Sequence, residues 1–203
     1  TYPVTWSDWK TKDFAKGRQH FLFFSGGGNV HKGLDLIVEA FVGTDLHLHI
    51  CQRISEDFAS AYSRELREYP HIHVYGSVTM RSPQFESLAH LCNWVISATC
   101  AEGQPGAIIE CMGHGLIPVL PESANIDLDD FGVRLRECTI GHIRETALET
   151  AQMSISECKK RFQLTLDTVR LAYTPERFNR SLKAAVQRIV DAHGAKGASH
   201  TGV

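Results

Sequence analysis

Several features that mark other classes of protein are missing from this chain of 203 residues. A basic excess is missing: 21 lysines and arginines stand against 23 aspartates and glutamates, which leaves a formal net charge of -2. Because nucleic-acid-binding proteins usually carry a clear basic excess, we expect no nucleic-acid partner. A long hydrophobic run is missing too, since no stretch approaches the ~20 apolar residues that a membrane span requires. We therefore expect a globular domain with no transmembrane segment.

Cysteines are present, but no CxxC motif occurs among them. Most of the six lie in apolar stretches: Cys51, Cys92, Cys100, Cys111, Cys138 and Cys158. This pattern is typical of buried free thiols in a reducing compartment and predicts a cytoplasmic protein. A signal peptide is also missing, although the chain begins at Thr1 rather than at methionine, which is compatible with a segment upstream.

The chain does contain a regular alternation of short apolar runs and helical patterns. Strands are predicted at residues 21–25, 46–51, 71–75, 94–98, 117–120 and 132–135. Helices are predicted at residues 31–42, 55–69, 82–91 and 105–114, and the pattern is wholly helical after Gly141. Strands separated by helices predict a doubly wound, Rossmann-like α/β fold: a parallel sheet of about six strands, helices on both faces and extra C-terminal helices.

The C-terminal helices have recognisable start signals. Ser154 and Glu157 form a capping box, and Thr174-Pro175 begins the last helix. Apolar side chains line one face of that helix: Phe178, Leu182, Val186 and Ile189. We divide the chain into a linker over 1–18, one domain over 19–193 and a disordered tail over 194–203.

The loop from Ser25 to Gly33 follows the first predicted strand, where ligands of open parallel sheets bind. Gly26, Gly27 and Gly28 allow the backbone N–H groups to approach a bulky anion. The next helix offers its positive end, and Lys32 adds a full charge. The spacing is not that of a P-loop, so the pattern indicates either a phosphate site or a flexible turn with a solvated lysine.

A second loop follows the fourth predicted strand and contains two glutamates. Pro105 suits the first helical position, so the backbone N–H groups of residues 103–107 should face the ligand crevice: Gly103, Gln104, Pro105 (which has no N–H), Gly106 and Ala107. Glu102 precedes this helix start, and Glu110 lies in the second turn. Two carboxylates so placed can accept hydrogen bonds from separate hydroxyl-bearing parts of one ligand. Solvated or locally paired glutamates are the alternative.

Together, residues 26–41 and 97–120 resemble the second domain of GT-B glycosyltransferases, in the large retaining family whose E-x7-E motif matches Glu102 and Glu110. Lys32-Gly33 matches the family's phosphate lysine and glycine. The G-x-V after the third strand matches Gly76, Ser77 and Val78. The resemblance covers about residues 21–119 and implies the nucleotide-sugar-binding half of such an enzyme.

The resemblance also implies roles for these residues. Glu102 would bind the donor sugar near the reacting carbon, Glu110 the ribose and Lys32 the diphosphate. The backbone of residues 103–107 would contact the sugar and diphosphate, and residues 76–78 the base. One departure is that glycines, Gly26 and Gly27, stand where the family usually has an arginine before the lysine.

The resemblance implies a hexosyltransferase-like activity with retention, in glycan or surface polysaccharide biosynthesis, without cofactor or metal. The partners would be a nucleotide sugar and a sugar or lipid-linked acceptor, the latter held by a missing N-terminal domain, so this domain alone would be inactive. The expected location is the cytoplasm or the inner membrane face. A non-catalytic nucleotide-sugar-binding or partner-stabilising module is the alternative, and a sugar-nucleotide epimerase is a third.

Histidines at alternate positions of two predicted strands raise the separate question of a metal site. His47 and His49 share one face of a strand, and His71 and His73 share one face of the next. Neighbouring strands would bring these imidazoles together, as in some metal sites. Because such residues more often fill a sheet face under a helix, we expect packing rather than metal binding.

Overall fold

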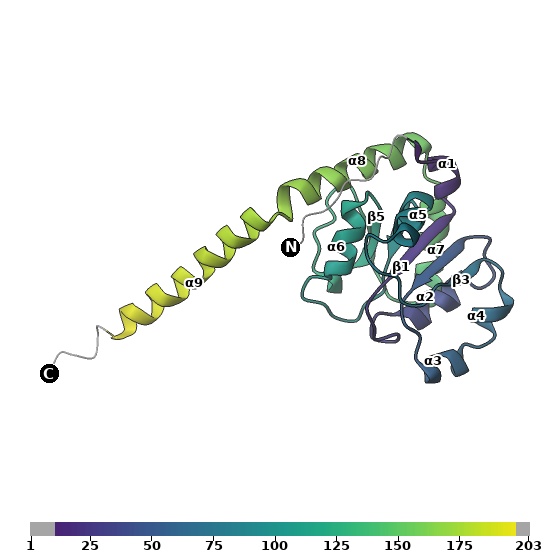
Figure 1. The fold of residues 1–203 in the computed structure, drawn as a ribbon, viewed down its shortest axis with the longest axis horizontal. Helices are drawn as coiled ribbons and strands as arrows, with labels where there is room; N and C mark the ends of the chain where they lie inside the picture. The colour runs from purple at the N-terminus through teal and green to yellow at the C-terminus, as the bar shows by residue number, and fades with distance from the viewer. Residues whose placement is uncertain (1–10, 198–203) are drawn as a thin grey trace.

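The computed structural model describes residues 11–197 and has a six-stranded sheet at its centre (Figure 1). The strands are β1 (His20–Phe24), β2 (His47–Cys51), β3 (Ile72–Val74), β4 (Trp94–Ile96), β5 (Ile117–Pro121) and β6 (Val133–Leu135). Their order is β3-β2-β1-β4-β5-β6, and every neighbouring pair is parallel. The doubly wound fold predicted from the sequence is confirmed, since buried apolar runs specify strands of a covered parallel sheet.

Helices cover both faces of the sheet. Phe21 and Phe23 of β1 pack into one core with α2 (Leu34–Phe41) and α7 (Ile140–Ala151). Leu22 and Phe24 point the other way, into a core with α5 (Pro83–Leu91) and α6 (Gly106–Gly113). This alternation is the period of two that a strand imposes on its side chains.

Two predicted helices differ from those observed. The helix expected from residue 31 begins at Leu34, because residues 29–33 form a turn before it. The helix expected over residues 55–69 is divided into α3 (Glu56–Ala61) and α4 (Glu65–Glu68). Only Phe58 is a buried side chain within α3, and α4 has none, so little packing holds these residues in one continuous helix.

The C-terminal helices begin where the caps predict. The Ser154 hydroxyl accepts a hydrogen bond from Glu157 N at the start of α8 (Ile155–Ala172). The Glu157 carboxylate accepts from Arg161 Nε at 2.8 Å, which is a different partner from the one a capping box provides. The last helix, α9 (Pro175–Gly197), starts at the predicted proline.

Helix α8 crosses from one core to the other. Phe162 and Leu166 are buried in the core of α2 and α7, whereas Val169 is buried in that of α5 and α6. Gly115 has a positive φ of 81° and no side chain, which lets the Phe162 ring lie against it. The added helices at the C-terminal end are therefore part of the packed domain at least through α8.

Part of the segment assigned to a linker over 1–18 is built into the domain. Residues 1–10 lie outside the described residues, but the short helix α1 (Phe14–Gly17) buries Phe14, whose ring meets Phe162 edge-on at 5.3 Å. The buried Lys12 ammonium donates to Ala89 O at 2.7 Å and Cys92 O at 2.6 Å, and burial lowers its pKa to about 8. These carbonyls lie at the end of α5, where a cation is favourable.

Helix α9 extends away from the body of the molecule (Figure 1). It continues to Gly197, past the predicted boundary at 193, and the rest of the predicted tail lies outside the described residues. Among the described residues, none of the helices combines the length and apolarity needed to cross a membrane. The six cysteines form no disulfide, and four of them are buried, while Cys100 is exposed and Cys138 is half-buried.

Candidate functional site

The order in which the chain adds strands to the sheet reverses between β1 and β4, the two central strands. The chain runs outward through β2 and β3 on one side and through β5 and β6 on the other. The loops after β1 and β4 therefore leave the sheet side by side, at the switch point where doubly wound folds bind ligands. Cys100 N donates to His31 O at 3.1 Å, which joins the two loops directly.

Gly33 makes this close approach sterically feasible. Its φ is +71°, and a Cβ atom at this position would lie 2.3 Å from Ala98 O. A side chain would be strained by the backbone conformation and would also collide with the neighbouring loop. Glycine at the start of α2 thus keeps the two loops in contact.

The loop after β1 is held in compact turns. Lys32 N donates to Gly28 O at 2.9 Å, and Gly33 N donates to Val30 O at 2.8 Å. Buried Asn29 anchors the loop from below, donating to Gln52 Oε1 at 2.6 Å. These hydrogen bonds fold the loop into successive turns above Asn29.

The loop after β4 is tied to the segment that follows β5. Glu102 N donates to Ser123 O at 3.0 Å, and Ser123 Oγ donates to Thr99 O at 2.7 Å. The Asn125 amide donates to Glu102 O. Ser123 and Asn125 were missed in the sequence, because nothing in their local pattern indicates the loop that they support.

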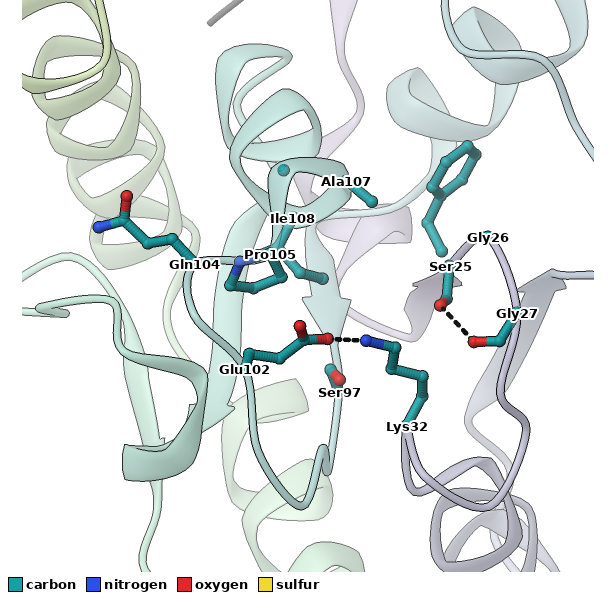
Figure 2. A pocket seen from close by; sticks show the side chains of 12 residues that line it. Ser25, Gly26, Gly27, Lys32, Ser97, Glu102, Gln104, Pro105, Ala107 and Ile108 are labelled. Carbon is teal, nitrogen blue, oxygen red and sulfur yellow. Dashed lines mark hydrogen bonds and ion pairs between the residues drawn. The ribbon is translucent and has the colours of Figure 1, made fainter. Parts of the chain in front are cut away.

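A pocket of about 330 Å³ lies between the two loops and under the start of α6. The Lys32 ammonium and the Glu102 carboxylate point toward each other across it and form an ion pair (Figure 2). Its lining includes eight of the predicted site residues: Gly26, Gly27, Lys32, Glu102, Gln104, Pro105, Gly106 and Ala107. Phe24, Ser25, Ser97 and Ile108 complete it. The volume is within the range of small-ligand sites.

The start of α6 contributes backbone polarity to the pocket. Pro105 is its N-cap residue and makes no side-chain hydrogen bond to the first turn. The first N–H groups of a helix have no partner within the helix, and they give that end a partial positive charge. With Lys32, this end favours an anion, while the Glu102 carboxylate can accept hydrogen bonds from hydroxyls.

The other predicted residues do not line this pocket. Gly28 and Gly103 belong to the two loops and are exposed. Gly76, Ser77 and Val78 follow β3, and Val78 packs partly against the core of α5 and α6. These positions remain predictions.

Glu110 lies in the second turn of α6 and is paired with a residue that was missed in the sequence. Arg81 Nη2 donates to both Glu110 oxygens, at 3.0 and 3.1 Å. Arg81 has a φ of 64°, which is unusual for a residue other than glycine. The pair joins residues 29 apart in sequence, so no local signal could have indicated it.

Buried His114 lies behind this pair, at the end of α6. Its Nδ1 is 3.4 Å from Glu86 Oε2, and its ring meets Phe85 edge-on. Burial lowers the His114 pKa, and the carboxylates of Glu86 and Glu110 act in the opposite direction. The neutral form that burial favours fits a packing role for His114.

Four histidines do cluster on the sheet, but the cluster contains His20 in place of the expected His71. His20, His47, His49 and His73 stack across β1, β2 and β3, with ring centroids 4.5 to 5.3 Å apart in the closest pairs. His71 instead lies beside Phe41 O at 3.1 Å, because β3 begins only at the next residue. Within the described residues, no group of three or more His, Cys, Asp or Glu side chains is arranged to hold a metal ion.

Comparison with known proteins identifies the fold. No family model matches the sequence, and neither does any curated protein. The C-terminal domain of LpcC, a glycosyl transferase group 1 family protein from Francisella tularensis, superposes with a TM-score of 0.64 and 15% identity, covering 79% of this chain and 93% of that one. Anabaena HepE in complex with UDP and glucose has a TM-score of 0.70 and 9% identity, covering 86% and 49%. A TarM variant from S. aureus, in complex with fondaparinux, α-GlcNAc-glycerol and UDP, has a TM-score of 0.67 and 16% identity. The match covers 90% of this chain and 37% of that one.

These similarities show that the chain has the fold of one half of a GT-B glycosyltransferase, as the sequence predicts. The chain spans nearly all of the LpcC domain but less than half of HepE and TarM. At such low identities the comparison identifies the fold, and the chemistry has to be argued from the site.

Proposed function

We propose that this chain is the donor-binding domain of a retaining glycosyltransferase. It would bind a nucleotide-diphosphate sugar, and a domain outside this sequence would hold the sugar or lipid-linked acceptor. The observation that carries the proposal is the pocket at the switch point, where Lys32, Glu102 and the start of α6 meet. We further propose a cytoplasmic role in glycan or surface polysaccharide synthesis, with the free cysteines as support for that location.

The chemistry needs positive charge at the leaving group. When the bond from the anomeric carbon to phosphate breaks, negative charge develops on the departing nucleoside diphosphate. Lys32 and the first N–H groups of α6 would stabilise that charge more strongly in the transition state than in the ground state. These groups would also neutralise the diphosphate without a divalent metal. No nucleophile from this domain enters a same-face displacement.

The Lys32–Glu102 ion pair would separate when the donor binds. Lys32 would exchange its carboxylate partner for the diphosphate, and Glu102 would accept hydrogen bonds from the sugar. Both side chains are partly buried, with 21% and 17% exposed. Their pairing would keep two otherwise unpaired charges in position before the donor binds.

Glu110 is paired with an arginine outside the pocket rather than with Lys32. We assign it to the ribose hydroxyls, and Arg81 already occupies its carboxylate. A carboxylate can accept up to about four hydrogen bonds, so Arg81 Nη2, which donates to both oxygens, and a diol can share it. Arg81 would then hold the carboxylate in position for the ribose. The base would lie near Gly76, Ser77 and Val78.

Calorimetric titration with UDP, GDP and ADP and their sugar conjugates tests the proposal. We expect one nucleoside diphosphate to bind, with a Kd between micromolar and millimolar. Lys32→Ala and Glu110→Ala should each weaken binding by about 1.5–3 kcal/mol, as expected for lost charge-assisted hydrogen bonds.

The matched control is Glu122→Gln. Glu122 is also a carboxylate just after a strand, β5, but 93% of its side chain is exposed and it does not line the pocket. This variant should bind like the parent chain. Binding that is indifferent to both Lys32 and Glu110 would overturn the assignment.

One observation favours the alternative of a non-catalytic module. Both glutamates of the motif are already paired with cations, as expected if the site had become structural. The two functions differ in turnover. A donor domain joined to its acceptor domain should release nucleoside diphosphate from the preferred conjugate, whereas a binding module should bind the conjugate and leave it intact.

A further inference from the structure

Cys100 is the exposed member of the six cysteines, all of which lie within the described residues. Four others are buried, and burial raises the pKa of each of these thiols, to about 12 for Cys51 and about 11 for Cys158. Because the thiolate is the form that reacts with oxidants, these buried thiols are inert at neutral pH. Reaction with an oxidant is therefore expected first at Cys100.

Cys100 lies where the candidate site meets the core of α2 and α7. Its N–H donates to His31 O at 3.1 Å, and Ala98, two residues earlier, is buried in that core. Glu102 follows two residues later, and its side chain points into the pocket (Figure 2). A change at Cys100 therefore acts on the loop that presents Glu102.

Cys138 approaches the same place from the loop between β6 and α7. It is half-buried and packs against the core of α2 and α7. The loops after β4 and β6 both leave the carboxyl ends of parallel strands, and only β5 lies between those strands. Burial raises the pKa of the Cys138 thiol, and charge on Cys100 raises it further, which places the two sulfur atoms within range of each other's charge.

A bond between these sulfur atoms would draw the two loops together. Strands separated by one neighbour lie about 10 Å apart, whereas the Cα atoms of a disulfide are about 4.4–6.8 Å apart. The loop after β4 can move, because residues 97–105 lie outside helices and strands. Its position depends on contacts with the segment after β5, where Glu102 N donates to Ser123 O and Ser123 Oγ donates to Thr99 O. A bond to Cys138 would compete with these contacts and displace Glu102.

We propose that peroxide joins Cys100 and Cys138 in a reversible disulfide, and that this bond weakens donor binding by displacing Glu102. The formation of the bond follows from the two cysteines alone, whereas its effect on the donor rests on the proposed function. Disulfides of cytosolic proteins are usually transient and redox-sensing, so such a bond agrees with the cytoplasmic location proposed above.

The reaction balances with one hydrogen peroxide. The Cys100 thiolate attacks a peroxide oxygen and breaks the O–O bond, which leaves a sulfenic acid on Cys100 and releases hydroxide. The Cys138 thiolate then attacks the Cys100 sulfur, the S–O bond breaks, and a second hydroxide leaves. The protons lost by the two thiols convert both hydroxides to water. Two thiols are thus oxidised by two electrons, and the peroxide is reduced to two waters.

Thiol counting on the full chain tests the disulfide. After denaturation, the reduced chain should take up six N-ethylmaleimide groups, and the peroxide-treated chain four, since two of the six thiols are joined. Intact mass spectrometry reads both numbers. Cys100→Ser should take up five groups before and after peroxide, and Cys138→Ser should keep a sulfenic acid on Cys100 that dimedone traps. A treated chain that keeps all six thiols, a link between two chains, or equal loss of two thiols in Cys100→Ser would overturn the proposal.

Nucleotide titration of the oxidised chain tests the effect on the donor. The Kd of the preferred sugar conjugate should rise by about tenfold, as for one lost charge-assisted hydrogen bond, and dithiothreitol should restore it. The Kd of the free nucleoside diphosphate should rise less, because Glu102 is assigned to the sugar. Cys138→Ser, treated in the same way, should bind the conjugate like the reduced parent chain.

The two experiments fail in different ways. A disulfide that forms without changing the Kd of the conjugate would overturn its effect on the donor. A reduced chain that binds no nucleotide would overturn the proposed function and that effect together, while the thiol count separately decides whether Cys100 and Cys138 are joined.

Discussion

Polar side chains in the loops beyond the strands differ from those on the strands themselves. In the loops and in the first turns of α6, Lys32–Glu102 and Arg81–Glu110 are pairs of opposite charge that remain partly exposed. On the strands, His20 at the start of β1 and His49 in the middle of β2 are buried and hydrogen-bonded to each other at 2.9 Å. Burial and the neighbouring imidazoles lower the pKa of His20 to about 4 and that of His49 to about 3, so these rings are neutral at pH 7.

This difference indicates which polar residues can bind a ligand and which only stabilise the sheet. A partly exposed ion pair can exchange one partner for a ligand at modest cost, because water and the ligand replace what is lost. The stacked neutral imidazoles are hydrogen-bonded to one another, so none of them can bind a ligand without losing a buried hydrogen bond. His49 donates or accepts toward both His20 and Tyr75, the latter at 3.0 Å. The histidines therefore behave as part of the sheet, and the charged pairs as a place for a ligand.

The largest effect is expected where the two loops of the site touch. Gly33→Ala should lower the free energy of unfolding by about 3 kcal/mol, because strain at positive φ adds to a collision with Ala98 O. Urea unfolding measures the loss. Gly26→Ala, in the same loop, has open space around its new Cβ and should change stability by less than about 0.5 kcal/mol. Equal effects of the two substitutions would show that the loop contact is unimportant.

The next effect is the pH dependence of stability that the stacked histidines produce. The pKa of each histidine is lower in the folded state than in the unfolded state. At a pH between these two pKa values, only the unfolded chain binds the proton. Stability is therefore complete above about pH 6.5 and decreases as the pH falls toward 4. Between pH 7 and pH 5.5, His20 and His49 together should cost about 2 kcal/mol of unfolding free energy. His49→Phe should flatten this slope, and an unchanged slope in that variant would contradict the assignment.

The smallest effect is expected for the charged pair of the pocket. Lys32→Ala should change the unfolding free energy by no more than about 1 kcal/mol, as for other partly exposed ion pairs. The same variant should lose nucleotide binding, so thermal shift with and without nucleotide distinguishes the two roles. A loss of stability as large as that of Gly33→Ala would mean that the pair is structural, and the contrast between the charged pairs and the histidines would disappear.

The sheet could be predicted from the sequence because each strand is a short apolar run covered on both faces. All six strands lie within two residues of their predicted positions. Helix starts were harder where glycine permits an unusual conformation: Gly33 has a positive φ, and α2 begins only after it. The predicted helix over 55–69 is divided because little packing holds it together, and its polar pattern did not indicate where the break would fall.

The sequence predicted those residues of the candidate site that belong to recognisable local motifs, but not the partners that come from distant parts of the chain. Lys32 and Glu102 were both assigned to one donor site through the resemblance, and they form an ion pair. Arg81 could not be assigned to Glu110, since only the path of the chain after β3 brings it there. His20 was left out of the histidine cluster because the first strand was expected to begin one residue later, and it is the register of β1 with β2 that aligns it with His47.

The crossing of α8 between the two cores has a consequence for how the protein is made. Phe14 lies near one end of the described chain and packs on Phe162, which is reached only after all six strands. During translation the strands leave the ribosome long before α8 does, so both cores stay open at one end until α8 has been made. This contact joins two residues far apart in the sequence, which predicts that the last step of folding is slow.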